Sequence, residues 1–219
     1  MDLAKIRTLL ANLDTACFCD ADKQIRVLDP AIRPIRDDLK LVGRAHTVRC
    51  RDDFLTVIQG LKEAEPGEVL VVDGQGGQRA LAGELFATEA ARKELAGLVI
   101  DGAVRDVRTI RELELPVYSR FIHPNAGTTR QIAETQVSIT CGGVKVRPGE
   151  IVFGDQDGII VLSEEELSSL LPKAREIQQK EEQVLARMAE GQSLLDMVNF
   201  DEHFENIVAR KPSKLNFIL

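Results

Sequence analysis

The 219-residue chain has no tryptophan and a single tyrosine, and aromatic residues make up only 4% of it. Proteins that bind single-stranded nucleic acids use aromatic rings as stacking platforms for the bases. The net charge of −7 also argues against broad contacts with phosphate backbones or anionic membrane surfaces. We therefore expect neither a nucleic-acid partner nor a membrane partner. A local cationic site for a small anion is compatible with this composition.

Long apolar runs and paired cysteines are absent as well. No apolar run approaches the roughly 20 residues that span a bilayer, and the first 16 residues, MDLAKIRTLLANLDTA, lack the continuous apolar segment of a secretory signal. Cys17 and Cys19 are too close together for an ordinary disulfide, and no CxxC pair completes a zinc site with Cys50 or Cys141. We expect free thiols in a cytoplasmic protein.

What the chain does contain is a strand-helix-strand pattern over residues 69–100. Val69–Val72 is a continuous apolar run, as expected for a strand buried on both faces, and a glycine-rich turn follows it over residues 73–77. An apolar stripe then predicts a helix from Leu81, ended by Gly97; the stripe consists of Leu85, Thr88, Ala91 and Leu95. Leu98–Ile100 reads as the next strand, turned by Asp101-Gly102. In such βαβ units ligands bind at the carboxyl ends of the strands.

Other patterns predict the elements around this unit. They indicate a helix over residues 4–13, a covering loop over 14–40, a strand over 41–50, a helix over 54–61, a helix over 107–113, strands over 117–122, 137–141 and 144–146, and a hairpin over 151–162. The composition, 44% hydrophobic and 29% charged, is that of a soluble globular protein with one sizeable domain.

The last quarter of the chain predicts a helical arm. Ser163 followed three residues later by Glu166 is a capping box, and Pro172 predicts the start of a second helix, which ends at Gly191. We divide the chain into an α/β catalytic domain over residues 1–165 and a C-terminal helical arm and tail over 166–219. The apolar side chains of the tail can pack on their own domain or on a neighbouring subunit.

Three charged residues are expected to meet at one end of the βαβ unit. Glu84 lies in the first turn of the helix, and Arg105 and Asp106 lie just after the second strand. Two carboxylates and a guanidinium around the amides of a helix start suit a divalent cation and an anionic substrate. The alternative is structural, because a strand-end Arg-Asp pair is also a common ion pair.

These residues also resemble a known family. Glu84, twenty residues, and then Arg105-Asp106 is similar to the acidic-X20-Arg-Asp signature of the aldolase branch of the RraA-like family. The resemblance extends over about residues 40–165 through four further segments, which are GRAHTV at 43–48, PGEVLVVDG at 66–74, VRPGE at 146–150 and GDQDG at 154–158. One departure is that the aldolase pattern has aspartate where this chain has Glu84.

The resemblance implies a fold and an activity. The fold would be an α/β sandwich of the swivelling β/β/α type with a C-terminal helical arm, assembled as a homo-trimer or hexamer. The activity would be that of a class II pyruvate aldolase that requires a divalent metal, Mg²⁺ or Mn²⁺. Such an enzyme cleaves 4-hydroxy-4-methyl-2-oxoglutarate-type 2-oxo acids to pyruvate and also decarboxylates oxaloacetate.

The resemblance also implies roles for the charged residues. Asp106 would bind the metal directly or nearly so, and Glu84 would hold one of the metal's water molecules. Arg105 would bind the substrate and hydrogen-bond its keto or enolate oxygen, where negative charge grows in the transition state.

The substrate carboxylate would be held by backbone amides at the helix start, where the helix dipole favours an anion. The segment that the resemblance assigns to this role contains Gly83, Leu85 and Phe86. The alternative is that water or Gln75 caps these amides.

Other functions stay open at this point. The RraA branch of the family binds and inhibits ribonuclease E without catalysis; that branch is expected to lack the acid after the arginine, so Asp106 favours the enzyme. Glu84 in place of aspartate leaves room for a different 2-oxo acid. The glycine loop at 74–77 is not a dinucleotide fingerprint, because Arg79 stands where a glycine is needed. His46, His123 and His203 show no mutual ligand spacing.

Overall fold

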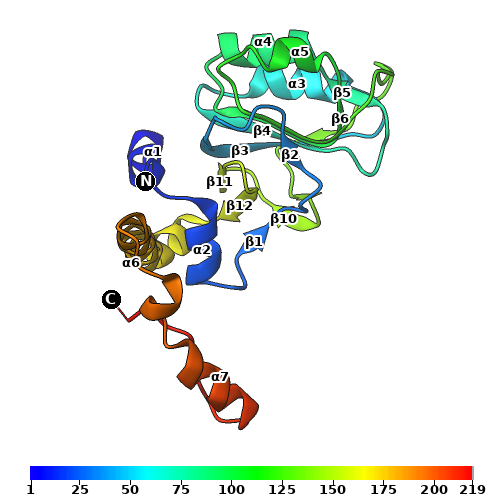
Figure 1. Ribbon diagram of the computed structural model, residues 1–219. Helices are drawn as coiled ribbons and strands as arrows, with labels where there is room; N and C mark the ends of the chain where they lie inside the picture. The colour runs from blue at the N-terminus through cyan, green and yellow to red at the C-terminus, as the bar shows by residue number, and fades with distance from the viewer. Residues whose placement is uncertain (219) are drawn as a thin grey trace.

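A mixed sheet of ten strands runs through the computed structural model, which describes residues 1–218 (Figure 1). Its strands follow the order β1-β12-β11-β3-β4-β6-β7-β2, with β5 on β6 and β8 on β3. Their bounds are β1 Arg26–Val27, β2 Arg33–Pro34, β3 Leu41–Arg49, β4 Glu68–Asp73, β5 Ala80–Ala82, β6 Gly97–Val104, β7 Val117–Ile122, β8 Glu134–Thr135, β11 Ile151–Gly154 and β12 Ile159–Leu162. A second, two-stranded sheet consists of β9 (Ile139–Cys141) and β10 (Val144–Val146).

The centre of the large sheet is parallel and covered on both faces. β3, β4, β6 and β7 pair in parallel, and their apolar side chains are almost all buried. Helices α3 (Leu55–Glu63), α4 (Glu84–Arg92) and α5 (Val107–Ile110) form a layer over one face (Figure 1). The small β9-β10 sheet contributes to the core on the opposite face. This is a mixed α/β fold of the kind that parallel strands require, because both of their faces must be buried.

Glycines set the close packing at the carboxyl ends of these strands. A Cβ on Gly74 would lie 2.4 Å from the Asp101 carbonyl oxygen, so the turn after β4 approaches β6 only because residue 74 has no side chain. The strand predicted over residues 98–100 is longer in the structure. As β6 it continues through Asp101-Gly102, where a turn was expected, and its pairing with β7 is irregular between Ile100 and Ala103.

The predicted helix from Leu81 was wrong at its start and in its buried face. Residues 80–82 form β5, which pairs with β6, so α4 begins only at Glu84. The helix buries Ala87 and Ala90, whereas Leu85 is 74% exposed. The apolar period of the sequence therefore mixed a strand residue, Leu81, and two exposed helix residues, Leu85 and Thr88, with Ala91 and Leu95, which do contact the core.

A third part of the core lies where the first helices of the chain and the long helix after residue 163 meet β11 and β12. Helices α1 (Leu3–Leu10), α2 (Thr15–Ala21) and α6 (Glu164–Ala189) pack there around Phe18 and Phe153, whose rings meet edge to face at 5.9 Å. The predicted loop over 14–40 thus contains a helix. Its cap comes from far along the chain: the Asp155 carboxylate accepts hydrogen bonds from the Thr15 amide (2.7 Å) and hydroxyl (2.8 Å).

The capping box at the start of α6 is present, with Ser163 and Glu166 bonded reciprocally. The expected break at Pro172 was wrong, because one helix of 26 residues contains this proline. A proline in a helix interior costs about 3 kcal/mol. The capped start and the burial of Leu167 and Ala174 on either side of the proline offset that cost. The tail continues as η1 (Leu194–Met197) and α7 (Phe200–Val208), away from the large sheet (Figure 1).

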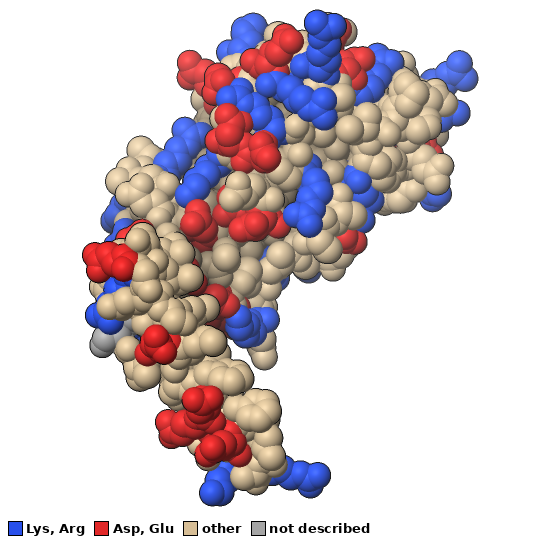
Figure 2. Space-filling view, in the orientation of Figure 1, with Lys and Arg blue, Asp and Glu red and all other residues tan. Residues whose placement is uncertain are grey.

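Among residues 1–218, no helix combines the length and the apolar character needed to cross a membrane. Acidic and basic side chains are interspersed over the α3-α4-α5 layer on the face seen in Figure 2.

The cap that Asp155 provides generates the first prediction. Asp155→Ala leaves the buried Thr15 amide and hydroxyl without an acceptor, so we expect a loss of about 2 kcal/mol in the free energy of unfolding, measured by urea denaturation. Asp157→Ala, an exposed position in the same turn, is the control and should change stability by less than about 0.5 kcal/mol. Equal stability of the two variants would contradict the assigned cap.

Candidate active site

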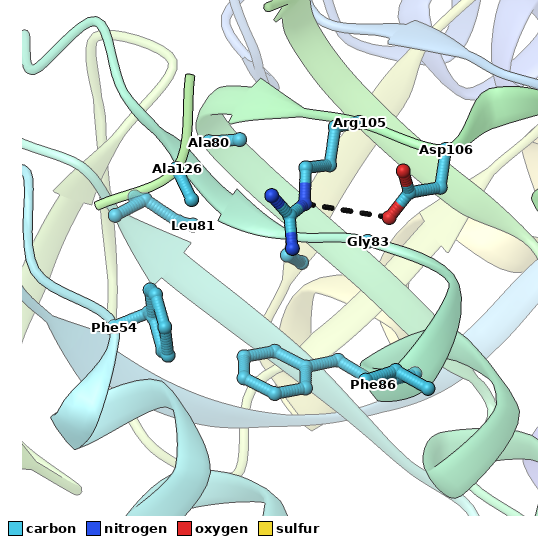
Figure 3. A pocket seen from close by; sticks show the side chains of 10 residues that line it. Phe54, Ala80, Leu81, Gly83, Phe86, Arg105, Asp106 and Ala126 are labelled. Atoms are coloured by element: carbon cyan, nitrogen blue, oxygen red, sulfur yellow. Dashed lines mark ion pairs between the residues drawn. The ribbon is translucent and has the colours of Figure 1, made fainter. Parts of the chain in front are cut away.

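A cavity opens where α4 and α5 begin, at the carboxyl ends of β5 and β6. It encloses about 430 Å³, including its open mouth. Its lining residues are Phe54, Ala80, Leu81, Ala82, Gly83, Leu85, Phe86, Arg105, Asp106 and Ala126. In Figure 3 the Arg105-Asp106 pair lies on one side of this cavity and the rings of Phe54 and Phe86 lie on another.

Asp106 contacts the first turn of α4. It stands directly before α5 with φ 56° and ψ 36°, a left-handed conformation that costs free energy for a residue other than glycine. Its Oδ2 lies 3.4 Å from the Glu84 amide nitrogen and 3.4 Å from Arg105 Nε. The sequence placed these residues at the same end of the unit, and the structure brings this carboxylate against the helix start.

Gly83 makes this contact sterically possible. A Cβ built on Gly83 would lie 2.5 Å from Asp106 Oδ2 and 3.1 Å from Arg105 Cγ. Gly83 is also the N-cap residue of α4, and having no side chain it cannot cap the first turn itself. The Glu84 amide contacts the Asp106 carboxylate, and the next two residues of this first turn, Leu85 and Phe86, line the cavity, where a helix start favours an anion.

Arg105 and Asp106 are accessible from solvent, with 45% and 37% of their side-chain surfaces exposed. An ion pair at this level of exposure contributes little to folding stability. Asp106 Oδ2 faces Arg105 and Glu84, and within residues 1–218 the other oxygen, Oδ1, has no hydrogen-bond donor. The pair therefore contributes charged groups to the cavity and contributes little to the stability of the fold.

Glu84 is oriented differently from Asp106. Its carboxylate accepts a hydrogen bond from the Thr109 hydroxyl on α5 at 2.7 Å, and Glu84 does not line the cavity. The sequence did not indicate Thr109 as a site residue. It lies in the short helix α5, and no local pattern shows that its hydroxyl contacts a side chain of α4. The two acids are thus close in the fold but occupy different sides of the α4 start.

Two adjacent aspartates hold the loops around the cavity. The Asp52 carboxylate accepts hydrogen bonds from the Gln78 and Arg79 amides, both at 2.9 Å. The Asp53 carboxylate accepts them from the Thr128 hydroxyl at 2.6 Å and from the amides of Arg130 and Gln131 at 2.6 and 3.2 Å. These two residues join the turn after β4 to the loop after β7.

Burial alone would raise the pKa of the Asp53 carboxyl, but the hydrogen bonds it accepts from residues 55, 128, 130 and 131 outweigh burial and lower its pKa. The carboxylate is therefore held ionised as an anchor for the loops. Two aspartates just before a helix are typical of a helix cap, and that local pattern carries no information on the distant loops.

The residues present fit a hydrated cation and not an all-protein metal cage. Among the described residues, no group of three or more His, Cys, Asp or Glu side chains is arranged to hold a metal ion. Mg²⁺ and Mn²⁺ sites often use one or two carboxylates and fill the remaining positions with water or substrate oxygens. An accessible carboxylate such as Asp106, next to a cavity, meets that requirement.

The other residues singled out in the sequence lie in structural contacts. The Asp101 carboxylate accepts hydrogen bonds from Arg120 Nε at 2.5 Å and from the Gly142 amide at 2.6 Å. His46 Nδ1 lies 3.0 Å from a Glu68 oxygen, and His203 Nδ1 lies 2.9 Å from the Ser213 hydroxyl. None of the described residues that line the cavity is a histidine.

The fold and the site together define a class: a mixed α/β protein whose helix start and strand-end Arg-Asp pair face one cavity. Comparison with known proteins assigns the family. Residues 15–161 match the sequence model of the RraA-like family, described as Aldolase/RraA. The chain belongs to this family, which confirms the resemblance and the expected fold class.

The similar proteins carry two kinds of functional description, an aldolase and an inhibitor of RNA processing. A protein of Halalkalibacterium halodurans, 35% identical over 177 residues, covers 80% of this chain and 84% of its own length. Its name is "Putative 4-hydroxy-4-methyl-2-oxoglutarate aldolase". The structure of the RNA-processing inhibitor RraA from Thermus thermophilis, 32% identical, superposes with a TM-score of 0.63 over 68% of this chain and 91% of its own.

A third comparison extends the likeness in fold. The crystal structure of an uncharacterised protein from Pseudomonas syringae pv. tomato has a TM-score of 0.78 and covers 88% of this chain and 96% of its own. At 24% identity it supports the fold alone.

The steric role of Gly83 generates the second prediction. Gly83→Ala places a methyl group 2.5 Å from Asp106 Oδ2, which is too close, so the carboxylate must move away from the helix start. We expect at least a tenfold loss in the affinity for Mn²⁺, measured by titration calorimetry, because displaced supporting contacts cost about 10- to 100-fold in metal sites. Thr88→Ala, at an exposed position on the same helix, should bind Mn²⁺ as the native protein does. Native affinity in Gly83→Ala would show that the close contact is dispensable.

Proposed function

We propose that this protein is a divalent-metal-dependent carbon-carbon lyase, a class II aldolase that cleaves 4-hydroxy-4-methyl-2-oxoglutarate-type 2-oxo acids to pyruvate and also decarboxylates oxaloacetate. The observation that carries the proposal is the single cavity shared by Arg105, Asp106 and the first-turn amides of α4. Membership of the family and the name of the Halalkalibacterium halodurans relative support it.

The charged end of the cavity suits the pyruvyl half of such a substrate. The amides of Leu85 and Phe86 would hold the substrate carboxylate at the start of α4. Arg105 would donate hydrogen bonds to the 2-keto oxygen, which gains negative charge as the enolate forms. Asp106 would hold Mg²⁺ or Mn²⁺ together with water molecules. When bound, the metal polarises the keto oxygen and stabilises the charge that develops there.

Cleavage also requires two proton transfers. The C3–C4 bond breaks, the C4 hydroxyl loses its proton as it becomes a carbonyl, and C3 gains a proton to give pyruvate. A water molecule would carry these protons, and Glu84, which the Thr109 hydroxyl holds outside the cavity lining, would act on them only through such a water. Decarboxylation of oxaloacetate leads to the same enolate of pyruvate, so it needs the same groups.

We further propose that the protein works as a homo-trimer or hexamer in the cytoplasm. Helix α7 buries none of its residues, and Phe200 and Phe204 on it are 45% and 56% exposed. Such an apolar surface favours contact with another subunit. All four cysteines are free thiols, which supports a reducing compartment.

The second candidate is a regulatory protein that binds ribonuclease E without catalysis. The likeness to the RNA-processing inhibitor from Thermus thermophilis favours it. Asp106 favours the lyase instead, since an accessible carboxylate in the lining of a cavity, beside a helix start, can hold a divalent cation. Co-purification with ribonuclease E, together with no pyruvate release from any 2-oxo acid, would support the regulatory protein.

The role of Asp106 generates the third prediction. With Mg²⁺ present, the native protein should release pyruvate from oxaloacetate faster than Mg²⁺ alone. Asp106→Ala and excess chelator should each lower this rate at least about 100-fold, the usual cost of losing one group that stabilises a developing oxyanion. Glu112→Gln, an exposed acid after α5, is the charge-matched control and should keep the native rate. Activity that survives both chelation and Asp106→Ala would refute the proposal.

The Thr109 contact generates the fourth prediction. Thr109→Val removes the hydroxyl that fixes Glu84, so we expect kcat for oxaloacetate to fall about tenfold with little change in KM. Thr109→Ser retains a hydroxyl at the same place and should restore most of the rate. If Thr109→Val and Thr109→Ser behave alike, Glu84 does not act from the position that Thr109 gives it.

A further inference from the structure

Helix α7 carries an apolar face that residues 1–218 leave exposed. Its large apolar side chains recur at steps of four, three and one, which places them along one side of the helix; they are Phe200, Phe204, Ile207 and Val208. Their exposed fractions are 45%, 56%, 55% and 69%. The rings of Phe200 and Phe204 stack on each other with centroids 5.7 Å apart, so the face is continuous. A contiguous apolar surface of this kind marks an interaction site.

The arm that presents this face is held together by its own hydrogen bonds, because the chain folds back along α7. The Asn216 amide donates a hydrogen bond to the Asn199 side-chain oxygen at 2.7 Å, and His203 Nδ1 lies 2.9 Å from the Ser213 hydroxyl. This return leaves His203 half-buried and the neighbouring Phe204 exposed, so it contacts a side of α7 other than the apolar face. In Figure 1, α7 lies at the opposite end of the molecule from α4 and α5, apart from the candidate active site.

Charges are divided along the arm. The acidic side chains lie within α7 and the basic ones follow directly after its end; they are Asp201, Glu202 and Glu205, and then Arg210 and Lys211. All five are exposed. Figure 2 shows this division at the lower end of the molecule, with acidic side chains on the arm and basic ones at its tip. Two arms packed antiparallel place each acidic half beside the basic end of the other, whereas parallel packing places like charges together.

A second apolar surface, the groove between α3 and α4, is a poorer complement to the arm. It is lined by charged residues together with Ile58, Leu61, Leu85 and Phe86. Two of its three cations already have partners. Arg92 forms an ion pair with Glu89 at 2.6 Å, and the Lys93 ammonium donates hydrogen bonds to three backbone carbonyls at the end of α3. Lys62 alone would remain to meet the three acids of α7, so the basic end of a second arm suits them better.

We propose that α7 is a contact surface between two copies of this chain, which pack antiparallel across a twofold axis through the face of Phe200 and Phe204. Each copy then offers the same surface, as an isologous contact requires. A closed trimer contains no twofold axis, so of the two proposed assemblies this contact specifies the hexamer, in which arms join two trimers. The inference rests on the proposed function only for the trimer. The contact itself requires neither the trimer nor the lyase activity.

The mass of the native protein in solution tests the twofold contact. Measured by light scattering after gel filtration, it should correspond to an even number of chains, six where the trimer also forms and two where it does not. Phe204→Asp places a charge in the middle of the apolar face and should halve that mass. Ile58→Ser, in the groove between α3 and α4, should leave it unchanged. A native trimer or monomer, a native mass in Phe204→Asp, or a loss of mass in Ile58→Ser would each overturn the inference.

Mixing two charge variants tests the antiparallel direction. Asp201→Lys with Glu202→Lys makes both ends of the arm basic, and Arg210→Glu with Lys211→Glu makes both ends acidic. Like charges then meet in either variant alone, so each should have half the native mass. An equal mixture should restore the native mass, because basic arms can pair with acidic ones. No gain in mass on mixing, or a native mass in the acidic variant alone, would overturn antiparallel pairing of the arms.

Two controls complete the design. Glu65→Lys with Glu112→Lys changes the net charge of the chain as the basic-arm variant does, at exposed positions outside the arm, and should keep the native mass. A lower mass in this control would show that net charge, and not the arm, sets the assembly. A native far-UV circular dichroism spectrum shows that each half-mass variant is folded. If the native protein releases no pyruvate from oxaloacetate with Mg²⁺, the proposed function fails while the masses still decide the arm contact.

Discussion

The approach of the Asp106 carboxylate to the first turn of α4 is the contact on which the rest of the site depends. It brings a strand end and a helix start together at 3.4 Å, and it exists because residue 83 has no side chain. The cost is visible in the backbone, since Asp106 adopts a left-handed conformation that most side chains avoid. In return, a carboxylate and a guanidinium line one cavity together with residues of a helix start, a combination that suits an anionic substrate and a cation.

The scaffold explains why this combination can be held in place. β6 is buried in the centre of a parallel sheet, so the position of Arg105 and Asp106 at its end is set by the core. The opposite side of the cavity is formed by loops, which hydrogen bonds to Asp52 and Asp53 hold in place. Asp53 remains ionised because the hydrogen bonds it accepts lower its pKa more than burial raises it. Charged groups thus fix the loops, while this side of the cavity stays apolar.

Much of this arrangement could be predicted from the sequence where the determinant is local. The apolar run at 69–72, the capping box at Ser163 and the placement of Arg105-Asp106 after a buried strand all follow from short patterns. The errors arise where a distant group decides the structure. Asp155 caps α2 from 140 positions away, β5 takes the residues that looked like a first helical turn, and packing carries α6 through Pro172. Thr109 and the phenyl rings of Phe54 and Phe86 were missed for the same reason, since each acts across elements.

The account predicts that the pyruvyl half of the substrate and the cation share the space between Arg105, Asp106 and the start of α4. A crystal structure of the protein with Mn²⁺ and oxalate, a mimic of pyruvate enolate, tests this most directly through the anomalous signal of manganese. The predicted result is a manganese peak beside Asp106, bound directly or through water, with oxalate against the α4 amides and Arg105. Manganese and oxalate bound elsewhere, with this cavity empty, would contradict the account.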